Sequence, residues 1–199
     1  MYTIGITGGV GAGKSQVMAY LKNAFDAEVL LADEVGHLVM KRGQRCYKKV
    51  RDLFGPEVVA ADGELDRSAI AARVFGHPEQ LEALNAIVHP AVKEYILEFQ
   101  ENQRKSGKKY FFLEAALLLE EKYDAICDEM WYVFASERVR AARLAQSRGY
   151  SAEKSRQIMA NQLPEEVFRK KTDFVLDNSG DFSETERQIQ EHMKELNRS

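Results

Sequence analysis

The segment GGVGAGKS at residues 8–15 constrains this chain more than any other part of its sequence. It matches the pattern GxxxxGK[ST], follows the apolar run at residues 2–7 and precedes a segment with helical spacing, VMAYLKNAF. A loop that wraps a polyphosphate turns successive N–H groups inward, which requires backbone angles and close contacts that a Cβ would obstruct. The strand, loop and helix context favours a phosphate-binding loop over a glycine-rich turn with a solvated lysine.

The motif also predicts a role for each of its residues. Loop amides and the N-terminus of the following helix would bind the phosphates of ATP. Lys14 would contact the β- and γ-phosphates, and the Ser15 hydroxyl would bind Mg²⁺, so we expect ATP and Mg²⁺ as cofactors. The nucleotide-binding residues expected here are Gly9, Gly11, Ala12, Gly13, Lys14, Ser15 and Gln16.

Composition narrows the class of protein. The 199 residues are 45% hydrophobic and 30% charged, which is typical of a globular protein, and the net charge of −3 gives no general attraction to nucleic acid or an anionic membrane. Neither a basic segment before the first short apolar run nor a run of the roughly 20 apolar residues of a membrane span is present. The two cysteines form no CxxC pair. We therefore expect a cytoplasmic protein without nucleic-acid or membrane partners.

Five apolar runs predict the strands of an α/β fold. They alternate with helical patterns, which favours a five-stranded parallel sheet flanked by helices, the P-loop NTPase fold. The expected strands are residues 2–7, 28–33, 110–114, 130–135 and 173–178.

Two segments depart from this alternation. Residues 36–108 contain helical patterns and no convincing strand, and predict an inserted helical lobe. Residues 136–163 contain two helical patterns joined around Gly149 and predict a helical lid. The P-loop core would then comprise residues 1–35, 109–135 and 164–199.

Two acidic residues are candidates for the chemistry. The chain lacks the NKxD sequence with which GTPases usually recognise guanine, so a small-molecule kinase is a better interpretation than a GTPase. Asp33, at the end of the second expected strand, could orient or deprotonate an acceptor hydroxyl, or equally cap the next helix. Glu114 could hold Mg²⁺ through water, or equally be a surface carboxylate at a strand end.

Basic residues give further candidates. Arg140, Arg143 and Arg148 could close over the phosphates, or form a solvated helix face. His89, which precedes Pro90 at an expected helix start, is more often a cap or a packed residue than a ligand.

An ordered set of short motifs resembles the dephospho-coenzyme A kinase family along nearly the whole chain. The motifs are TGGVGAGKS, AD at residues 32–33, FGPE at 54–57, LDR at 65–67, VF at 74–75, IVHP at 87–90, LLLE at 117–120, GYS at 149–151, IMANQ at 158–162 and TDFVLDNSG at 172–180. The family's fold is a P-loop core of five parallel strands with a helical substrate lobe and a lid. Its members use ATP and Mg²⁺ to phosphorylate the ribose 3′-hydroxyl of dephospho-coenzyme A.

The resemblance implies further roles. Asp33 becomes the carboxylate that activates the acceptor, with His89 and Leu117 as substrate contacts. Asn178 and Gly180 would lie near the adenine of ATP, and Arg140, Arg143 and Arg148 would act from the lid. We expect a monomer or weak homo-oligomer. A kinase for another nucleoside or nucleotide, or a nucleotide-binding module without catalysis, stays open as an alternative.

The chain also departs from the family pattern. Leu31 stands where the family often has aspartate, and Ala116 where it has proline. The family places two lid arginines four residues apart, whereas Arg143 and Arg148 are five apart with Ser147 at the expected position. One extra residue turns a side chain by about 100° around a helix.

Overall fold

The computed structural model describes residues 1–115, 118–120 and 122–198. It divides into two compact units. The first comprises Met1–Val29 with Gly107–Ser199, and the second comprises Leu30–Ser106. The first unit contains the loop predicted to bind phosphate, and the second consists mainly of helices.

A five-stranded parallel sheet has the strand order β2-β3-β1-β4-β5. Its strands are β1 (Tyr2–Thr7), β2 (Ala27–Leu31), β3 (Tyr110–Glu114), β4 (Glu129–Phe134) and β5 (Phe174–Asp177). The predicted five strands and their parallel arrangement are confirmed. The ends of β4 and β5 differ from the expected ends by one residue, and those of β2 by one and two residues. Because β1 lies between β3 and β4, the loop that follows β1 leaves the sheet at its centre.

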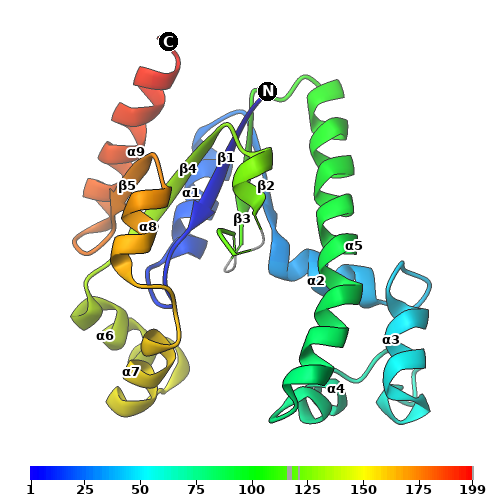
Figure 1. The fold of residues 1–199 in the computed structure, drawn as a ribbon. Helices are drawn as coiled ribbons and strands as arrows, with labels where there is room; N and C mark the ends of the chain where they lie inside the picture. Colours follow the sequence, from blue (N-terminus) through cyan, green and yellow to red (C-terminus); the bar gives the residue numbers. More distant parts are fainter. Residues whose placement is uncertain (116–117, 121, 199) are drawn as a thin grey trace. The chain divides into compact units, whose positions relative to one another are not determined.

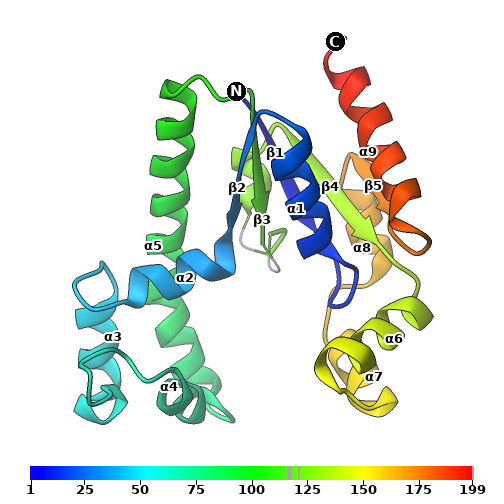
Figure 2. The same cartoon turned by 180° about the vertical axis from the view of Figure 1, so that it is seen from behind.

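Helices cover both faces of the sheet. Figure 2 shows α1 (Lys14–Ala24) and α9 (Phe182–Leu196) in front of the strands, and Figure 1 shows α8 (Glu165–Lys171) and the 3₁₀ turn η2 (Tyr123–Ile126) on the other face. Alternate residues of β1 point to opposite faces, so Ile4 and Ile6 both face α1 and α9. None of the described helices is long and apolar enough to cross a membrane.

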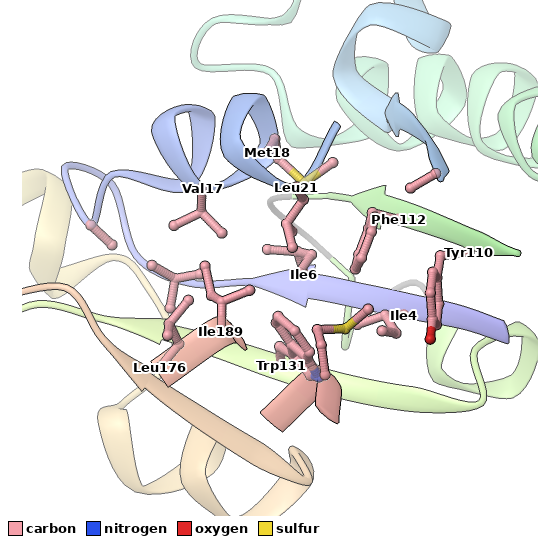
Figure 3. Packing of buried hydrophobic residues seen from close by; sticks show 14 of the residues in the cluster. Ile4, Ile6, Val17, Met18, Leu21, Tyr110, Phe112, Trp131, Leu176 and Ile189 are labelled. Atoms are coloured by element: carbon pink, nitrogen blue, oxygen red, sulfur yellow. The ribbon is translucent and has the colours of Figure 1, made fainter. Parts of the chain in front are cut away.

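The main hydrophobic core lies between the strands and the α1 and α9 face. Figure 3 shows Phe112 and Trp131 from the strands packed beneath Leu21 of α1, with Ile189 of α9 closing the same layer. Phe112 and Trp131 are fully buried, with their ring centroids 6.1 Å apart. Removing such side chains from water contributes about 2–3 kcal/mol each. This packing fixes both ends of the loop between β1 and α1.

Two further helices follow β4. They are α6 (Glu137–Arg148) and α7 (Ala152–Ala160), as the arginine-rich pattern predicts. Gly149 ends α6 with a left-handed φ of 64°, and the Ser151 hydroxyl then accepts a hydrogen bond from the Lys154 N–H at 3.1 Å to cap α7.

The second unit is built around one long helix. It contains α2 (Ala32–Met40), α3 (Tyr47–Phe54), the 3₁₀ turn η1 (Pro56–Val58), α4 (Arg67–Val74) and α5 (Pro78–Lys105). Helices α2, α3 and α4 pack against α5, as Figure 1 shows. Buried aliphatic residues form the core, among them Val35, Val39, Val50, Ile70, Val92 and Ile96. Residues 36–109 are all described and contain helices and one isolated bridge, Val59 to Leu65, as expected.

Two local expectations are wrong. Strand β2 ends at Leu31, so Asp33 is the second residue of α2 and not a strand end, and its side chain forms no cap hydrogen bond. The buried residues Ala32, Val35 and Val39 have helical spacing, which starts the helix earlier than the apolar run suggests. His89 lies inside α5 and not at a helix start. Burial of Val92 and Ile96 carries that helix through Pro90, although proline removes one backbone hydrogen bond.

Candidate active site

Gly8 and Gly13, in the loop from β1 to α1, each combine a positive φ with no room for a Cβ. Gly13 precedes α1 with a left-handed φ of 92°, and a Cβ there would strike the Asn178 side-chain amide. Gly8 has φ 152°, and its Cβ would lie 2.5 Å from the Val133 carbonyl oxygen. An L side chain would therefore meet both backbone strain and steric conflict. The loop fits closely among neighbouring segments.

Side chains outside the loop hold its carbonyl groups. The Val10 carbonyl accepts a hydrogen bond from Arg140 Nε at 2.8 Å. The Ala12 carbonyl accepts from Arg143 Nη1 at 3.1 Å and from Asn178 Nδ2 at 2.8 Å. In a planar trans peptide the N–H points opposite to the C=O, so the next two N–H groups, of Gly11 and Gly13, point away from these donors. The arrangement turns backbone donors toward one side of the loop, as an anion site requires.

Lys14 is held across the loop that it follows. Its Nζ donates a hydrogen bond to the Gly8 carbonyl at 2.8 Å and lies 3.5 Å from Glu114 Oε1. Both side chains are largely buried, with exposed fractions of 14% and 10%. Glu114 is the last residue of β3, the strand beside β1, so the sheet itself brings this carboxylate to the lysine. A cation and an acidic side chain therefore lie together at the carboxyl ends of two neighbouring strands.

The first turn of α1 contains no acidic residue. Ser15 and Gln16 are both exposed there. The first N–H groups of a helix have no partner within the helix, and its dipole places partial positive charge at this end. The Ser15 hydroxyl is thus an accessible hard oxygen ligand beside a surface that favours anions.

Arg140 and Gln162 both form hydrogen bonds to the backbone of Val10 in the loop. Gln162 Oε1 accepts hydrogen bonds from the Val10 N–H at 3.0 Å and from Arg140 Nη2 at 2.6 Å. Burial lowers the pKa of the Arg140 guanidinium from its usual value. A Cβ on Gly9 would lie within 2.5 Å of Arg140 Cζ, so Gly9 is glycine because this guanidinium packs on it.

Comparison with known proteins places the chain in a family. Residues 2–184 match the family model described as dephospho-CoA kinase. The chain belongs to the dephospho-CoA kinase family. It is 35% identical over 187 residues to the dephospho-CoA kinase of Geobacillus kaustophilus (strain HTA426), an alignment that covers 94% of this chain and 92% of the relative.

Two solved structures have a similar fold. The protein TT1252 from Thermus thermophilus is similar, with a TM-score of 0.82 and 34% identity over 98% of this chain and 97% of that one. A dephospho-CoA kinase from Campylobacter jejuni shares the fold, with a TM-score of 0.74 and 20% identity over 98% and 96% of the two chains.

The dephospho-CoA kinase fold separates the predicted arginines into two groups. Arg140 and Arg143, three residues apart on α6, both donate hydrogen bonds to loop carbonyls. Arg148 is the exposed last residue of α6, with its guanidinium 5.9 Å from the centroid of the Tyr150 ring. Ser147 donates a hydrogen bond to the Arg143 carbonyl at 2.7 Å.

The segment after β5 contains the residues expected near adenine. Asn178 is fully buried, and its Oδ1 accepts a hydrogen bond from Thr185 Oγ1 at 2.9 Å. That bond orients the amide so that Nδ2 faces the Ala12 carbonyl. Gly180 is exposed between β5 and α9, with open space where a Cβ would stand.

Four further residues named from the sequence remain. Asp33 is exposed in the first turn of α2, and His89 is partly buried within α5. Both belong to the helical unit. Leu117 and Ala116 lie outside the described residues.

Sequence reasoning missed two residues of the loop's support. Gln162 carries no recognisable chemical signal, although it closes the motif IMANQ. Thr185 sits in an ordinary amphipathic helix and its role follows only from its bond to Asn178. The motif IMANQ could have pointed to Gln162, whereas no sequence pattern predicts a role for Thr185.

Proposed function

We propose that this protein transfers the γ-phosphoryl group of ATP to the ribose 3′-hydroxyl of dephospho-CoA, giving CoA and ADP. Membership of the dephospho-CoA kinase family supports the substrate pair. The observation that supports this chemistry is the position of Lys14 Nζ, 2.8 Å from the Gly8 carbonyl oxygen. In the same loop the Val10 and Ala12 carbonyls are bonded to arginines outside the loop. Such a loop stabilises phosphoryl charge without rearranging during the reaction.

The proposed reaction is a single displacement at phosphorus. The acceptor 3′-oxygen forms a bond to the γ-phosphorus, the bond to the oxygen bridging the β- and γ-phosphorus breaks, and the hydroxyl proton passes to a carboxylate. Lys14 would exchange the Gly8 carbonyl for phosphate oxygens and neutralise charge on the transferring group. The loop amides would hold the β-phosphate in line with the attacking oxygen.

Residues present at the loop fit a magnesium ion. Mg²⁺ prefers oxygen ligands and keeps several waters, and when bound to ATP it neutralises charge on the β- and γ-phosphates. The exposed Ser15 hydroxyl would supply a direct ligand. Glu114, beside Lys14 at the end of β3, would hold one of the ion's waters.

The remaining roles complete the proposal. Asp33 would orient and deprotonate the acceptor hydroxyl, and its exposed position in the first turn of α2 leaves the carboxylate accessible. His89 would contact the acceptor, and Gly180 would line the adenine site. The fully buried Asn178 would support that site through its bonds to Ala12 and Thr185. Residues 36–108 would form the substrate lobe and residues 136–163 a lid. Within this lid Arg140 and Arg143 would hold the loop through its carbonyls, and the exposed Arg148 would close over the phosphates. The enzyme would act in the cytoplasm as a monomer or weak homo-oligomer.

A product analysis tests the proposed function. Purified protein is incubated with ATP, Mg²⁺ and dephospho-CoA, ADP release is followed by a coupled assay, and the product is identified by phosphorus NMR. A new phosphomonoester on the ribose 3′-oxygen, formed with ADP in equal amounts, supports the proposal. Turnover of a different acceptor in a nucleoside and nucleotide panel, with none for dephospho-CoA, would replace it with another kinase activity. ATP binding without any acceptor-dependent ADP would leave a nucleotide-binding module.

A further inference from the structure

A closed ring of hydrogen bonds joins both ends of the α6 and α7 segment to one loop residue. The Val10 N–H donates to Gln162 Oε1 at 3.0 Å, and the Val10 carbonyl accepts from Arg140 Nε at 2.8 Å. The ring closes where Arg140 Nη2 donates to the same Gln162 oxygen at 2.6 Å. Arg140 lies near the start of α6, and Gln162 follows α7.

Gln162 provides the one side-chain acceptor in this ring. Its amide oxygen accepts two hydrogen bonds, one from the Val10 N–H and one from Arg140 Nη2. A side-chain amide oxygen has two lone pairs, so both are used. The bond from a guanidinium is charge-assisted and therefore stronger than a neutral one. Gln162 thus fixes the orientation of the Arg140 guanidinium as well as the Val10 peptide.

The orientation of Arg140 affects the loop at a second point. The guanidinium packs directly on Gly9, where a Cβ would come within 2.9 Å of Nη1 and 2.5 Å of Cζ. Arg140 is partly buried, and this burial lowers the pKa of its guanidinium. A rotation of Arg140 would therefore disturb the first half of the loop, from Gly9 to Val10.

We propose that Gln162 is a positioning residue for phosphoryl transfer. It acts through Arg140 and Val10 to hold the loop in a fixed position against the segment formed by α6 and α7. The inference rests on the proposed function, because it assigns Gln162 to the same triphosphate site. Gln162 fixes the first half of the loop, while the amides of Gly11 and Gly13 stay turned toward the ligand side. A loop held in advance loses less conformational freedom when the triphosphate binds.

Three substitutions and a matched control test this role. Gln162→Leu removes the acceptor and keeps a side chain of similar size, whereas Gln162→Glu keeps an acceptor oxygen for both donors. Gln162→Asn shortens the side chain by one methylene and serves as a second variant should leucine prevent folding. The control is Gln157→Leu on α7, where the side chain of the exposed glutamine donates a long, 3.5 Å hydrogen bond to Glu153 Oε1. Each variant is assayed for ATP dissociation constant by calorimetry, for kcat and both KM values, and for melting temperature.

We expect Gln162→Leu to weaken ATP binding about tenfold and to lower kcat by a similar factor, since two hydrogen bonds are lost. The KM for dephospho-CoA should stay unchanged. Gln162→Glu should recover ATP binding to within about threefold of the wild type, because a charged acceptor still pairs with Arg140. Gln157→Leu should match the wild type in every measurement.

A double mutant separates positioning from general destabilisation. If Gln162 acts partly through Arg140, adding Gln162→Leu to Arg140→Ala should weaken ATP binding by clearly less than Gln162→Leu weakens it in the wild type, because only the bond from the Val10 N–H is then left to lose. Three outcomes would each overturn the inference. They are additive losses of ATP affinity in the double variant, wild-type ATP affinity in Gln162→Leu, and ATP binding by Gln162→Glu as weak as that of Gln162→Leu. ATP calorimetry needs no acceptor, so a wild-type protein inactive on dephospho-CoA would reject the proposed function while these binding results still decide the role of Gln162.

Discussion

Arg143 and Asn178 donate hydrogen bonds to the same carbonyl oxygen, that of Ala12, at 3.1 and 2.8 Å. The arginine comes from α6 and the asparagine follows β5, and Arg143 Nη2 also donates to the Asn178 carbonyl at 2.9 Å. Two segments distant in sequence therefore hold one peptide of the phosphate-binding loop. The loop geometry depends on the whole sheet unit and not on its glycines alone.

Replacing Asn178 by aspartate should weaken the loop. The new carboxylate oxygen would face the Ala12 carbonyl where an N–H donor now stands, and the site is fully buried. We expect a loss of about 1–3 kcal/mol in unfolding free energy and at least tenfold weaker ATP binding. Thermal unfolding and calorimetry measure both effects. Asn102→Asp, at an exposed position of α5, should change neither quantity appreciably.

Gly13→Ala tests whether ATP binding requires glycine at this position because of the contact with the Asn178 side chain or because of backbone strain. Gly13 and Gly43 have similar left-handed φ values of 92° and 81°, but a Cβ meets the Asn178 side chain only at Gly13 and has open space at Gly43. Alanine should cost each site about 1–2 kcal/mol of stability from strain. ATP binding should be lost by more than tenfold in Gly13→Ala and retained in Gly43→Ala. Equal affinities in the two variants, measured by titration, would argue against a steric role for Asn178.

Lys14→Met should abolish most of the catalysis. The substitution keeps a long side chain and removes the cation that lies beside the Gly8 carbonyl and Glu114. Loss of a fixed donor to the transferring group predicts a kcat lower by about 100- to 1,000-fold. Lys22→Met, at an exposed position of the same helix, is the matched control. Steady-state kinetics with ATP and dephospho-CoA should show the full loss only for Lys14.

Asp33→Asn should separate chemistry from nucleotide binding. If the carboxylate accepts the hydroxyl proton, turnover should fall by about 100- to 10,000-fold while the ATP dissociation constant stays unchanged. Glu34→Gln provides the control, since both residues are exposed in the first turn of α2. A variant Asp33→Asn with wild-type turnover would remove Asp33 from the mechanism and leave the phosphate site intact.

Stability should decrease at alkaline pH. Burial raises the pKa of the Cys127 thiol to about 12, above the ordinary value of 9.0 that applies to the unfolded chain. The folded protein therefore retains a proton that the unfolded chain releases, and its stability falls as the pH rises from about 9 towards 12. Urea unfolding between pH 7 and 10.5 measures the slope. Cys127→Ala should reduce it, although burial also raises the pKa of Tyr132 and of Cys46.

The sequence predicts the strands well because buried parallel strands are continuous apolar runs. Residues 2–7 and 110–114 match β1 and β3 at both ends. It fails where a run passes directly into a helix, as at Asp33, or where packing carries a helix through a proline, as at His89. In both places buried residues on one helix face outweigh the local signal.

The sequence by itself determined that a glycine-rich loop with Lys14 and Ser15 joins a buried strand to a helix, because this information lies within a dozen neighbouring residues. Only the tertiary structure decided which side chains hold that loop. Arg140 and Asn178 reach it from 130 and 166 residues away along the chain, and Gln162 from 152. Local periodicity records which face of a segment is buried, whereas a hydrogen bond between distant segments exists only after the sheet and its helices have packed together.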